Sequence, residues 1–346
     1  MSRFGVAAHE NTTPPRRVVL FPNLHTGRVR STGMDLTDAR VLITGGAGLV
    51  GSHLAATLHD DGATVRVADD LSKGDRDRVP DGAEFVKADL TDPDDVTAAV
   101  TADLDVVFHF AAYTDTNYDD DRELFEANTE MTYNVLQCMH EVDVDRLAFT
   151  SSSTVYGEAP RPTPEDYAPL EPISIYGSSK LADEALISTH AHSYDLTAWV
   201  FRFANIVGPH QRGTVIPDFI EKLLADPDAL EILGDGRQEK SYMHVSECVD
   251  AIQHVVEHAD KNLNTYNLGT RTTTSVTAIA DVVSDELGVD PEYSYTGGER
   301  GWTGDVPKMR LSIEKLSALG WEPELSSHES VRKATRQLVD EIVDST

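Results

Sequence analysis

The sequence has few cysteines, few lysines and no long apolar run. Its two cysteines, Cys138 and Cys248, are too few for a disulfide framework or a zinc site, and both lie in apolar helical patterns that predict buried thiols. The 13 histidines show no metal-ligand spacing, so no metal site is expected. No apolar run reaches the roughly 18 residues that a membrane-spanning helix needs, so no membrane partner is predicted.

Positive charge is scarce as well. Against 59 acidic residues stand 29 Lys and Arg, which gives a formal net charge of −30, and only nine of the basic residues are lysine. A field of this sign repels phosphate backbones, so nucleic acid is not expected as a partner. Many carboxylates with few lysines favour a cytoplasmic, halophilic protein in a salt-loaded cytosol, where salt screens self-repulsion. The alternative is an acidic composition that arose without any adaptation to high salt.

The first 33 residues differ from the rest in charge. They hold five arginines and one glutamate, a net charge of +4, which leaves −34 for the remainder. Pro22 and Asn23 interrupt their short apolar stretch, which argues against a secretion signal. We expect residues 1–33 to be either a disordered extension or a misassigned start, with Met34 as the natural first residue.

Strand and helix patterns alternate from Arg40 onward. With 40% hydrophobic residues, the 346-residue chain can bury a large core. Short apolar runs predict strands at 40–44, 64–68, 84–88, 105–110, 146–150 and 197–203, and helical patterns lie at 49–61, at 129–142 and from about 176. This alternation predicts an α/β fold, a doubly wound, Rossmann-like parallel sheet with helices on both faces.

The stretch "TGGAGLVGSH" places Gly45, Gly48 and Gly51 between the first strand and its helix, with Leu49 and Val50 in the same turn. Glycines permit a tight turn and a close backbone approach to a pyrophosphate, which then sits at the helix N-terminus. The sequence therefore predicts a dinucleotide site here.

An acidic residue follows at the expected place. Asp69 ends the second strand, as expected of a carboxylate that accepts hydrogen bonds from ribose hydroxyls, and Asp70 is the alternative. Because a carboxylate there would repel a 2′-phosphate, NAD is predicted over NADP.

The motifs together resemble a known family. The Gly-x-x-Gly-x-x-Gly turn, "YGSSK" and "FRFANIVGP" are similar to those of extended short-chain dehydrogenases/reductases of the NAD-dependent epimerase/dehydratase family, over about 41–321. The resemblance implies an enzyme that binds NAD. The further cofactor contacts that it implies are Asp89, Leu90, Phe110, Ala111, Ala112, Asn128, Thr150, Tyr176, Lys180 and Phe203.

The catalytic pair implied by the resemblance is Tyr176 and Lys180. Residues four apart share a helix face, so both can act on one pocket, although such pairs also recur by chance. A free phenol has a pKa of about 10, and the ammonium together with a charged nicotinamide is expected to lower that pKa. The family places a serine beside the tyrosine, here Ser152, which can relay a proton. Tyr156 is expected to be structural.

The hydroxyl run "TSSST" at 150–154 separates two activities that the resemblance leaves possible, dehydration and epimerisation. Family dehydratases carry an Asp-Glu pair just before "VYG", where this chain has Ser153 and Thr154. The pattern is similar to that of the 4-epimerases of the family, which implies an isomerase that interconverts nucleotide sugars such as UDP-glucose and UDP-galactose by transient oxidation at C4. A second nucleotide-sugar oxidoreductase, a simple ketoreductase and a cofactor-sensing protein are the alternatives.

After Pro209 the alternation weakens, which predicts a smaller α+β lobe. We predict a NAD-binding domain at 34–208 and a mainly substrate-binding lobe at 209–346, with a strand near 265–270 returning to the main sheet and the active site between the two. The resemblance also implies a homodimer that is joined through helices at about 123–142 and 178–190.

A nucleotide sugar brings a diphosphate that requires cations. Lys240 and Trp302 stand where the family commonly has arginine, and Arg300 or Arg237 is expected to compensate. Met309 stands where some epimerases of the family have a bulky tyrosine that restricts the 2-substituent of the sugar, so the pocket is expected to admit an N-acetyl group. Substrates with a carboxylate, such as UDP-glucuronate, are a further alternative. The implied substrate-binding residues are Ser152, Ser153, Tyr176, Asn205, Val215, Lys240, Arg237, Arg300 and Met309.

Overall fold

The computed structural model describes residues 33–114, 121–301 and 304–344. The chain divides into two units, Met1–Ser31 and Thr32–Thr346, and all described residues belong to the second. The extension predicted at 1–33 therefore lies, except for Gly33, outside the described residues, as does Trp302.

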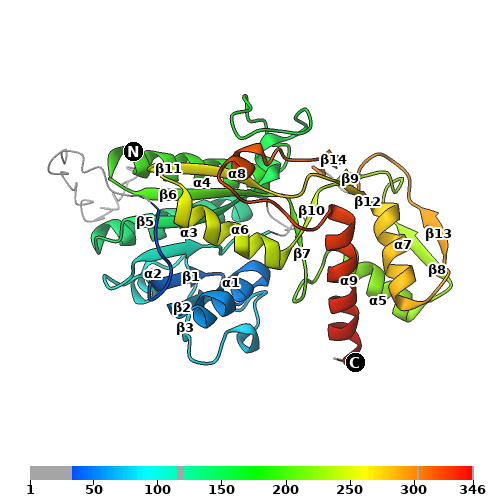
Figure 1. Ribbon diagram of the computed structural model, residues 1–346, viewed down its shortest axis with the longest axis horizontal. Coiled ribbons are helices and arrows are strands. Elements are labelled where there is room, and N and C mark those ends of the chain that lie inside the picture. Colours follow the sequence, from blue (N-terminus) through cyan, green and yellow to red (C-terminus); the bar gives the residue numbers. More distant parts are fainter. Residues whose placement is uncertain (1–32, 115–120, 302–303, 345–346) are drawn as a thin grey trace, which may run out of the picture. The chain divides into compact units, whose positions relative to one another are not determined.

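The centre of the structure is a seven-stranded parallel sheet (Figure 1). Its strands, in spatial order, are β11 (Leu263–Leu268), β6 (Thr197–Phe203), β5 (Arg146–Ser152), β4 (Val106–His109), β1 (Arg40–Thr44), β2 (Thr64–Asp69) and β3 (Glu84–Lys87). The order reverses between β4 and β1, because β2 and β3 extend in one direction from β1 and β4 to β6 extend in the other. Open α/β sheets bind ligands at such a reversal, at the carboxyl ends of the strands.

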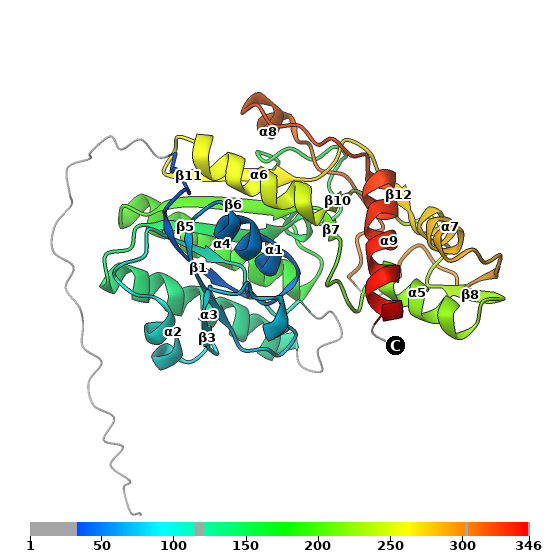
Figure 2. The ribbon, with the colours of Figure 1, turned by 60° about the horizontal axis from the view of Figure 1, so that its bottom comes forward.

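Helices cover both faces of this sheet, so the predicted Rossmann-like class is confirmed. They are α1 (Leu49–Asp60), α2 (Pro93–Ala99), α3 (Asp121–Glu141), α4 (Ile175–Ser193) and α6 (Val245–His258). Successive side chains of a strand point to opposite faces: Val41 and Ile43 pack in the core with α1 and α6, and Leu42 packs in the core with α2, α3 and α4. Figure 2 shows α6 above the sheet and α2 and α3 below it.

A second core lies among the helices at the right of Figure 1, away from the main sheet. Its helices are α5 (Val215–Ala225), α7 (Val276–Leu287) and α9 (Ser327–Asp344). The short strands form three small sheets, β10 (Tyr242–His244) with β7 (Asn205–Val207), β12 (Thr274–Ser275) with β9 (Glu239–Lys240) and β14 (Lys308–Met309), and β13 (Glu292–Tyr295) with β8 (Ala229–Ile232). Two elements from this half of the chain return to the main sheet. The strand β11 pairs with β6, and the helix α8 (Glu314–Ala318) packs against β11.

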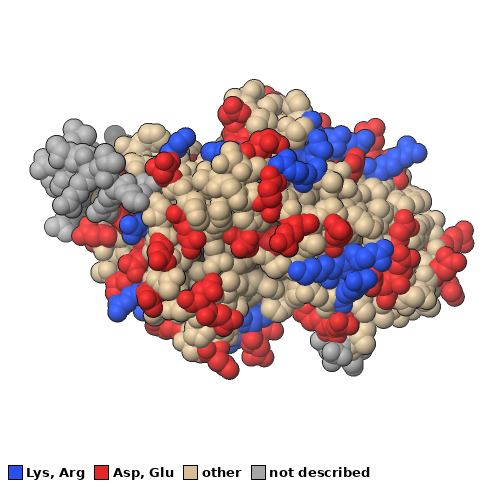
Figure 3. Space-filling view, viewed as in Figure 1, with Lys and Arg blue, Asp and Glu red and all other residues tan. Residues whose placement is uncertain are grey.

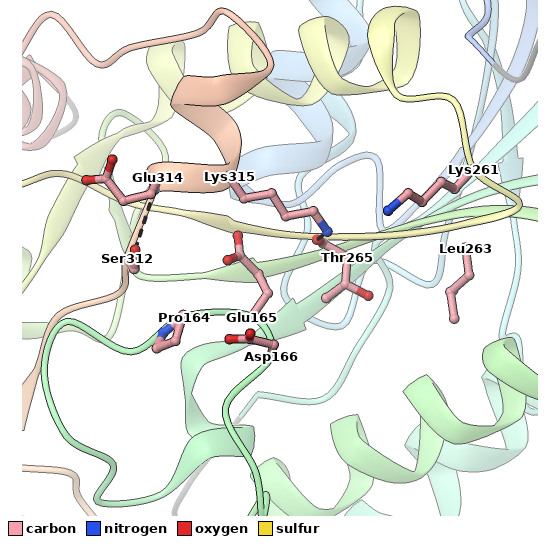
Figure 4. Close-up of a pocket in the computed structure, with 9 residues that line it drawn as sticks. All are labelled: Pro164, Glu165, Asp166, Lys261, Leu263, Thr265, Ser312, Glu314 and Lys315. Carbon is pink, nitrogen blue, oxygen red and sulfur yellow. Dashed lines mark hydrogen bonds between the residues drawn. The ribbon is translucent and has the colours of Figure 1, made fainter.

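Charged side chains protect the free edge of β11. Lys315 Nζ donates to the Thr265 carbonyl oxygen at 2.6 Å, and the Asn267 N–H donates to Glu165 Oε1 at 2.9 Å. These contacts border an open cavity of about 480 Å³ (Figure 4). Because unpaired strand edges invite association, we interpret this cavity as part of the edge protection. It lies along the amino-terminal half of β11, not at the carboxyl ends of the strands.

Candidate active site

The glycine turn after β1 is built for close backbone approach. Gly45 has a left-handed φ of 65°, which favours glycine, and a Cβ on Gly51 would collide with the Gly45 carbonyl oxygen. Gly48 is the N-cap of α1 and makes no side-chain cap hydrogen bond, and Leu49 and Val50 form the first helical positions. The first N–H groups of a helix have no intrahelical partner, so this turn fits a pyrophosphate.

Asp69 holds the same turn in place. Its Oδ2 accepts from the Ala47 N–H at 3.0 Å, within the glycine motif, and its Oδ1 accepts from the Leu71 N–H at 2.9 Å. Burial raises the pKa of this carboxyl group. Each oxygen has a second lone pair, so Asp69 at the carboxyl end of β2 can also accept from a ribose hydroxyl. The neighbouring Asp70 is half-buried and accepts from the Ser72 N–H at 2.8 Å.

The segment after β4 faces the glycine turn. Thr44 Oγ1 accepts from the N–H groups of Phe110 and Ala111, each at 3.2 Å, and a Cβ on Gly45 would meet Ala111. Phe110, Ala111 and Ala112 are all half-buried. The structure therefore brings these three predicted cofactor contacts together with the glycine turn.

Asn128 of α3 ties this segment to α4. Its Oδ1 accepts from the Tyr113 N–H at 2.8 Å, and its Nδ2 donates to Ser179 Oγ at 3.1 Å. Because Ser179 belongs to α4, Asn128 fixes the helix that carries Tyr176 relative to the predicted cofactor cleft.

The other predicted cofactor contacts lie at or just beyond strand ends. Asp89 is exposed just after β3, where its Oδ1 accepts from the Thr91 N–H at 3.0 Å, and Leu90 beside it is buried. Thr150 is buried in β5, and Phe203 is the half-buried last residue of β6. Since carboxyl ends of parallel strands meet at one edge, these positions fit the same site.

Tyr176 lies in the first turn of α4, next to the end of β5. Ser174 begins the helix, because its Oγ accepts from the Gly177 N–H at 3.1 Å. Burial raises the pKa of Tyr176, the charge of Asp183 raises it further, and a hydrogen bond with Ser152 lowers it. Ser152 Oγ also accepts from Thr154 Oγ1 at 2.9 Å. The structure thus joins the Tyr176 and Ser152 hydroxyls.

Lys180 is fully buried one turn further along α4. Its Nζ lies 4.5 Å from the centroid of the Phe149 ring, and burial lowers its pKa to about 8. The predicted lowering of the Tyr176 pKa combined this ammonium with the charge of the nicotinamide. In the structure burial and then the charge of Asp183 raise the Tyr176 pKa by more than the Ser152 hydrogen bond lowers it. A Tyr176 pKa below its usual value therefore stays a prediction for the protein with NAD bound.

Tyr156 lies elsewhere, in a buried network. Its hydroxyl donates to Asn267 Oδ1 at 2.8 Å and accepts from Arg202 Nη1 at 2.8 Å, and burial raises its pKa to about 12. Arg202 is in turn paired with Glu184 of α4 at 2.7 Å. These contacts give Tyr156 a structural role.

Two of the three predicted cations meet at one acidic residue. Lys240 Nζ lies 2.5 Å from Asp305 Oδ1, and the Asp305 side chain is 1% exposed. Arg300 donates to the Asp305 carbonyl oxygen and pairs with Glu158, two residues beyond Tyr156. Arg237 does not join them, since it lies exposed in the turn before β9.

The remaining predicted substrate contacts lie at four places. Ser153 begins the turn after β5, and Val215 is the first residue of α5 and packs against the second core. Asn205, at the start of β7, is half-buried and bonds to Tyr242 through its side chain. Met309 is 8% exposed and packs in a cluster that includes Val155 and Tyr156, just past the end of β5.

The structure also contains a buried polar group that the sequence analysis did not predict. It comprises Asp183, Thr132, His109 and Thr44. The spacing gave one usable signal, because Asp183 follows Tyr176 by seven residues and Lys180 by three, and so shares their helix face.

In the part of the chain that the structure describes, no group of three or more His, Cys, Asp or Glu side chains could hold a metal ion. Nor is any helix in that part long and apolar enough to cross a membrane.

Comparisons with known proteins identify the family of this chain. A family model described as "NAD dependent epimerase/dehydratase family" matches residues 41–269. The UDP-glucose 4-epimerase of Mycolicibacterium smegmatis is 31% identical over 308 residues, which cover 85% of this chain and 96% of that protein. A crystal structure of a UDP-galactose 4-epimerase aligns with a TM-score of 0.80 and 38% identity, over 88% of this chain and 99% of that one.

A further solved structure holds a cofactor. The UDP-glucose 4-epimerase of Thermus thermophilus, in complex with NAD, aligns with a TM-score of 0.78 and 30% identity. The alignment covers 86% of this chain and 98% of that chain.

Proposed function

Because this chain belongs to the NAD-dependent epimerase/dehydratase family, we propose that it is a nucleotide-sugar 4-epimerase that uses NAD. The observation that carries the proposal is the pair of hydroxyls from Tyr176 and Ser152 at the carboxyl end of β5, followed along the chain by Ser153 and Thr154. Hydroxyls can move the proton of a sugar hydroxyl but cannot supply the acid and base that expel water.

Each residue of the site has a definable task. Tyr176 removes the proton of the sugar 4-hydroxyl, and Ser152 relays it over the short distance that proton transfer requires. NAD supplies the hydride acceptor and donor that make inversion at C4 possible. The glycine turn and Asp69 would hold NAD, and Lys180 would contribute positive charge beside it. Lys240 and Arg300 supply the cations for the diphosphate of the substrate.

Proton NMR of a nucleotide-sugar panel tests this function. The purified protein is incubated in strong KCl, without added cofactor, with UDP-glucose, UDP-galactose and their N-acetyl and uronate analogues. We expect the two C4 epimers of at least one sugar to interconvert. Stoichiometric consumption of added NADH would favour a reductase instead, and a 4-keto-6-deoxy product would favour a dehydratase. Turnover of UDP-glucose without turnover of UDP-N-acetylglucosamine would contradict the inference from Met309.

The choice of NAD over NADP depends on Asp69. The Asp69→Ala variant removes the carboxylate that would accept from the ribose and repel a 2′-phosphate. Hydrogen bonds to a charged group contribute about 1.5–3 kcal/mol, so we expect NAD affinity to fall by about ten- to hundred-fold and NADP binding to appear. Titration calorimetry measures both. Asp70→Ala is the matched control; if it has the larger effect, Asp70 is the ribose ligand.

Salt is expected to stabilise the protein. Acidic side chains spread over the face seen in Figure 3, and the net charge is −30. Raising KCl from about 0.1 M to about 1 M shortens the Debye length from ~10 Å to ~3 Å and screens this repulsion. We expect the melting temperature to rise over that range, and not to rise equally in sucrose of matched osmolality. A flat response to KCl would remove the support for a salt-loaded cytosol.

A homodimer through α3 and α4 is part of the proposal. The two helices pack along each other, and Tyr133 on α3 is 52% exposed, so its ring is available to a second subunit. Light scattering should therefore give twice the monomer mass for the native protein and the monomer mass for Tyr133→Glu. Leu233→Glu, at an exposed apolar residue after β8, serves as the control and should stay dimeric. A monomeric native protein would exclude this interface.

A further inference from the structure

A buried carboxylate on α4 has no task in the function proposed above. Asp183 is 1% exposed and shares one helix face with Tyr176 and Lys180. Neither of its oxygens makes a close hydrogen bond to a described residue. A buried carboxylate in this state is strongly unfavourable unless an opposite charge compensates it.

The compensating charge is the ammonium of Lys180. Lys180 is also 1% exposed, and two carboxylates, Asp183 and then Glu184, favour its charged form. Glu184 is already paired with Arg202 at 2.7 Å. Asp183 is therefore the carboxylate whose charge is left for Lys180.

A hydrogen-bonded chain approaches Asp183 from the sheet. Thr44 Oγ1 accepts from two backbone N–H groups, so its own proton is free to be donated to His109 Nδ1 at 2.8 Å. Neutral His109 then donates from Nε2 to Thr132 Oγ1 at 3.2 Å. The Thr132 hydroxyl, whose hydrogen bonding lowers the pKa of Asp183, is left to donate toward that carboxylate. The chain thus favours an ionised Asp183.

We propose that Asp183 is a positioning residue that keeps Lys180 protonated and thereby sets the upper pH limit of the reaction that Tyr176 performs. The inference rests on the proposed function for its kinetic part only. Its structural part, a buried ammonium and a buried carboxylate three residues apart on α4, stands on the burial of both side chains and on the lack of a close hydrogen bond to the Asp183 oxygens among the described residues.

The direction of the pH effect follows from the neighbouring charges. Burial lowers the pKa of Lys180 to about 8 and raises that of Asp183 to about 7. Both groups are therefore charged between these values, and Lys180 loses its proton as the pH rises above about 8. Burial and then Lys180 lower the pKa of His109 to about 3, so His109 stays neutral in this window. The negative charge of Asp183 raises the pKa of Tyr176. Removing that charge would lower the Tyr176 pKa, so the acidic limb of the pH–rate profile cannot move to higher pH.

The pH–rate profile of Asp183→Asn tests the kinetic part. Asparagine keeps the shape and removes the charge, so the Lys180 ammonium becomes easier to deprotonate. We expect the basic limb of kcat to move to lower pH by about one to three units, the usual effect of an opposite charge. At pH values above the pKa that sets this limb, kcat falls about tenfold for each pH unit. Glu257→Gln, which removes an exposed carboxylate on α6, should leave the profile unchanged. A basic limb at the native position in Asp183→Asn overturns the proposal.

Thermal unfolding tests the charge pair without any activity. Lys180→Met leaves the Asp183 carboxylate buried and uncompensated, so its melting temperature should fall. Adding Asp183→Asn to Lys180→Met should raise the melting temperature again, because no buried charge is left alone. Strictly additive losses would refute the pair. If the native protein does not epimerise any sugar, the proposed function fails, and this cycle still decides whether Asp183 and Lys180 act together.

Discussion

The Tyr176→Phe variant should lose about 10²–10⁴-fold in turnover, the usual contribution of a positioned acid–base group, while it still binds NAD. Phenylalanine keeps the ring in the first turn of α4 and removes only the hydroxyl that Ser152 contacts. The proton of the sugar hydroxyl then has no acceptor, whereas the glycine turn and Asp69 are unchanged. NMR rates measure the turnover, and the nucleotide released on denaturation of the purified variant measures cofactor retention.

Tyr156→Phe is the matched control, since it removes the same atom from the other tyrosine of this region. The Tyr156 hydroxyl bonds with Asn267 and Arg202. Its loss leaves buried partners unsatisfied, so we expect about 1–3 kcal/mol less free energy of unfolding and native turnover per folded molecule. If Tyr156→Phe loses turnover and Tyr176→Phe keeps it, the assignment of the base is wrong.

Local sequence patterns predicted most of the main sheet. The strand at Thr197–Phe203 has the predicted bounds, whereas β5 runs two residues beyond its predicted end. Its extra residues, Ser151 and Ser152, pair with Arg202 and Phe203 of β6. Hydroxyl residues carry no apolar signal, so only the neighbouring strand reveals that the ladder continues.

The start of α3 shows the same limit. The apolar pattern predicted a helix from about residue 129, but α3 begins at Asp121. Its first turn contains Asp121, Arg122 and Glu123, which are exposed and lack apolar periodicity. Acidic residues suit a helix N-terminus, yet the same residues are also common in loops. Periodicity alone could not separate the two.

In the candidate site, motifs that are short in sequence were predictable and pairs that are distant were not. The glycine turn and the Tyr176–Lys180 spacing are local patterns. The contact of Asp69 with the Ala47 N–H spans 22 residues, and the pair of Lys240 with Asp305 spans 65. Such contacts depend on how strands and lobes meet. Only the fold therefore shows that a predicted phosphate ligand, Lys240, is held by a buried acid.

The second large effect is expected on stability. Glu184→Ala should lower the free energy of unfolding by about 3–5 kcal/mol, because it leaves a buried charge without its partner. Arg202 donates to both Glu184 oxygens, from Nε at 2.9 Å and from Nη2 at 2.7 Å, and its side chain is 7% exposed. Ser151 also donates to Glu184 at 2.5 Å. Urea unfolding at constant KCl measures the change.

An exposed pair on the neighbouring helix provides the contrast. Arg122 and Glu126 lie 2.7 Å apart on α3, with side chains 81% and 57% exposed. Solvated pairs contribute little, so Glu126→Ala should change stability by less than about 0.5 kcal/mol. Equal losses for Glu126→Ala and Glu184→Ala would mean that burial does not set the strength of these pairs.

The double variant Glu184→Leu, Arg202→Met distinguishes the cost of an uncompensated buried charge from the loss of the surrounding hydrogen bonds. If the loss in Glu184→Ala comes from an uncompensated guanidinium, replacing both charges with apolar side chains should recover most of it. The Tyr156 hydroxyl would still lose its Arg202 partner but keep Asn267, so recovery should stop short of the native value by about 1 kcal/mol. A double variant no more stable than Glu184→Ala would instead mean that the network of Glu184, Arg202 and Tyr156 stabilises the end of β5 through its hydrogen bonds rather than through charge.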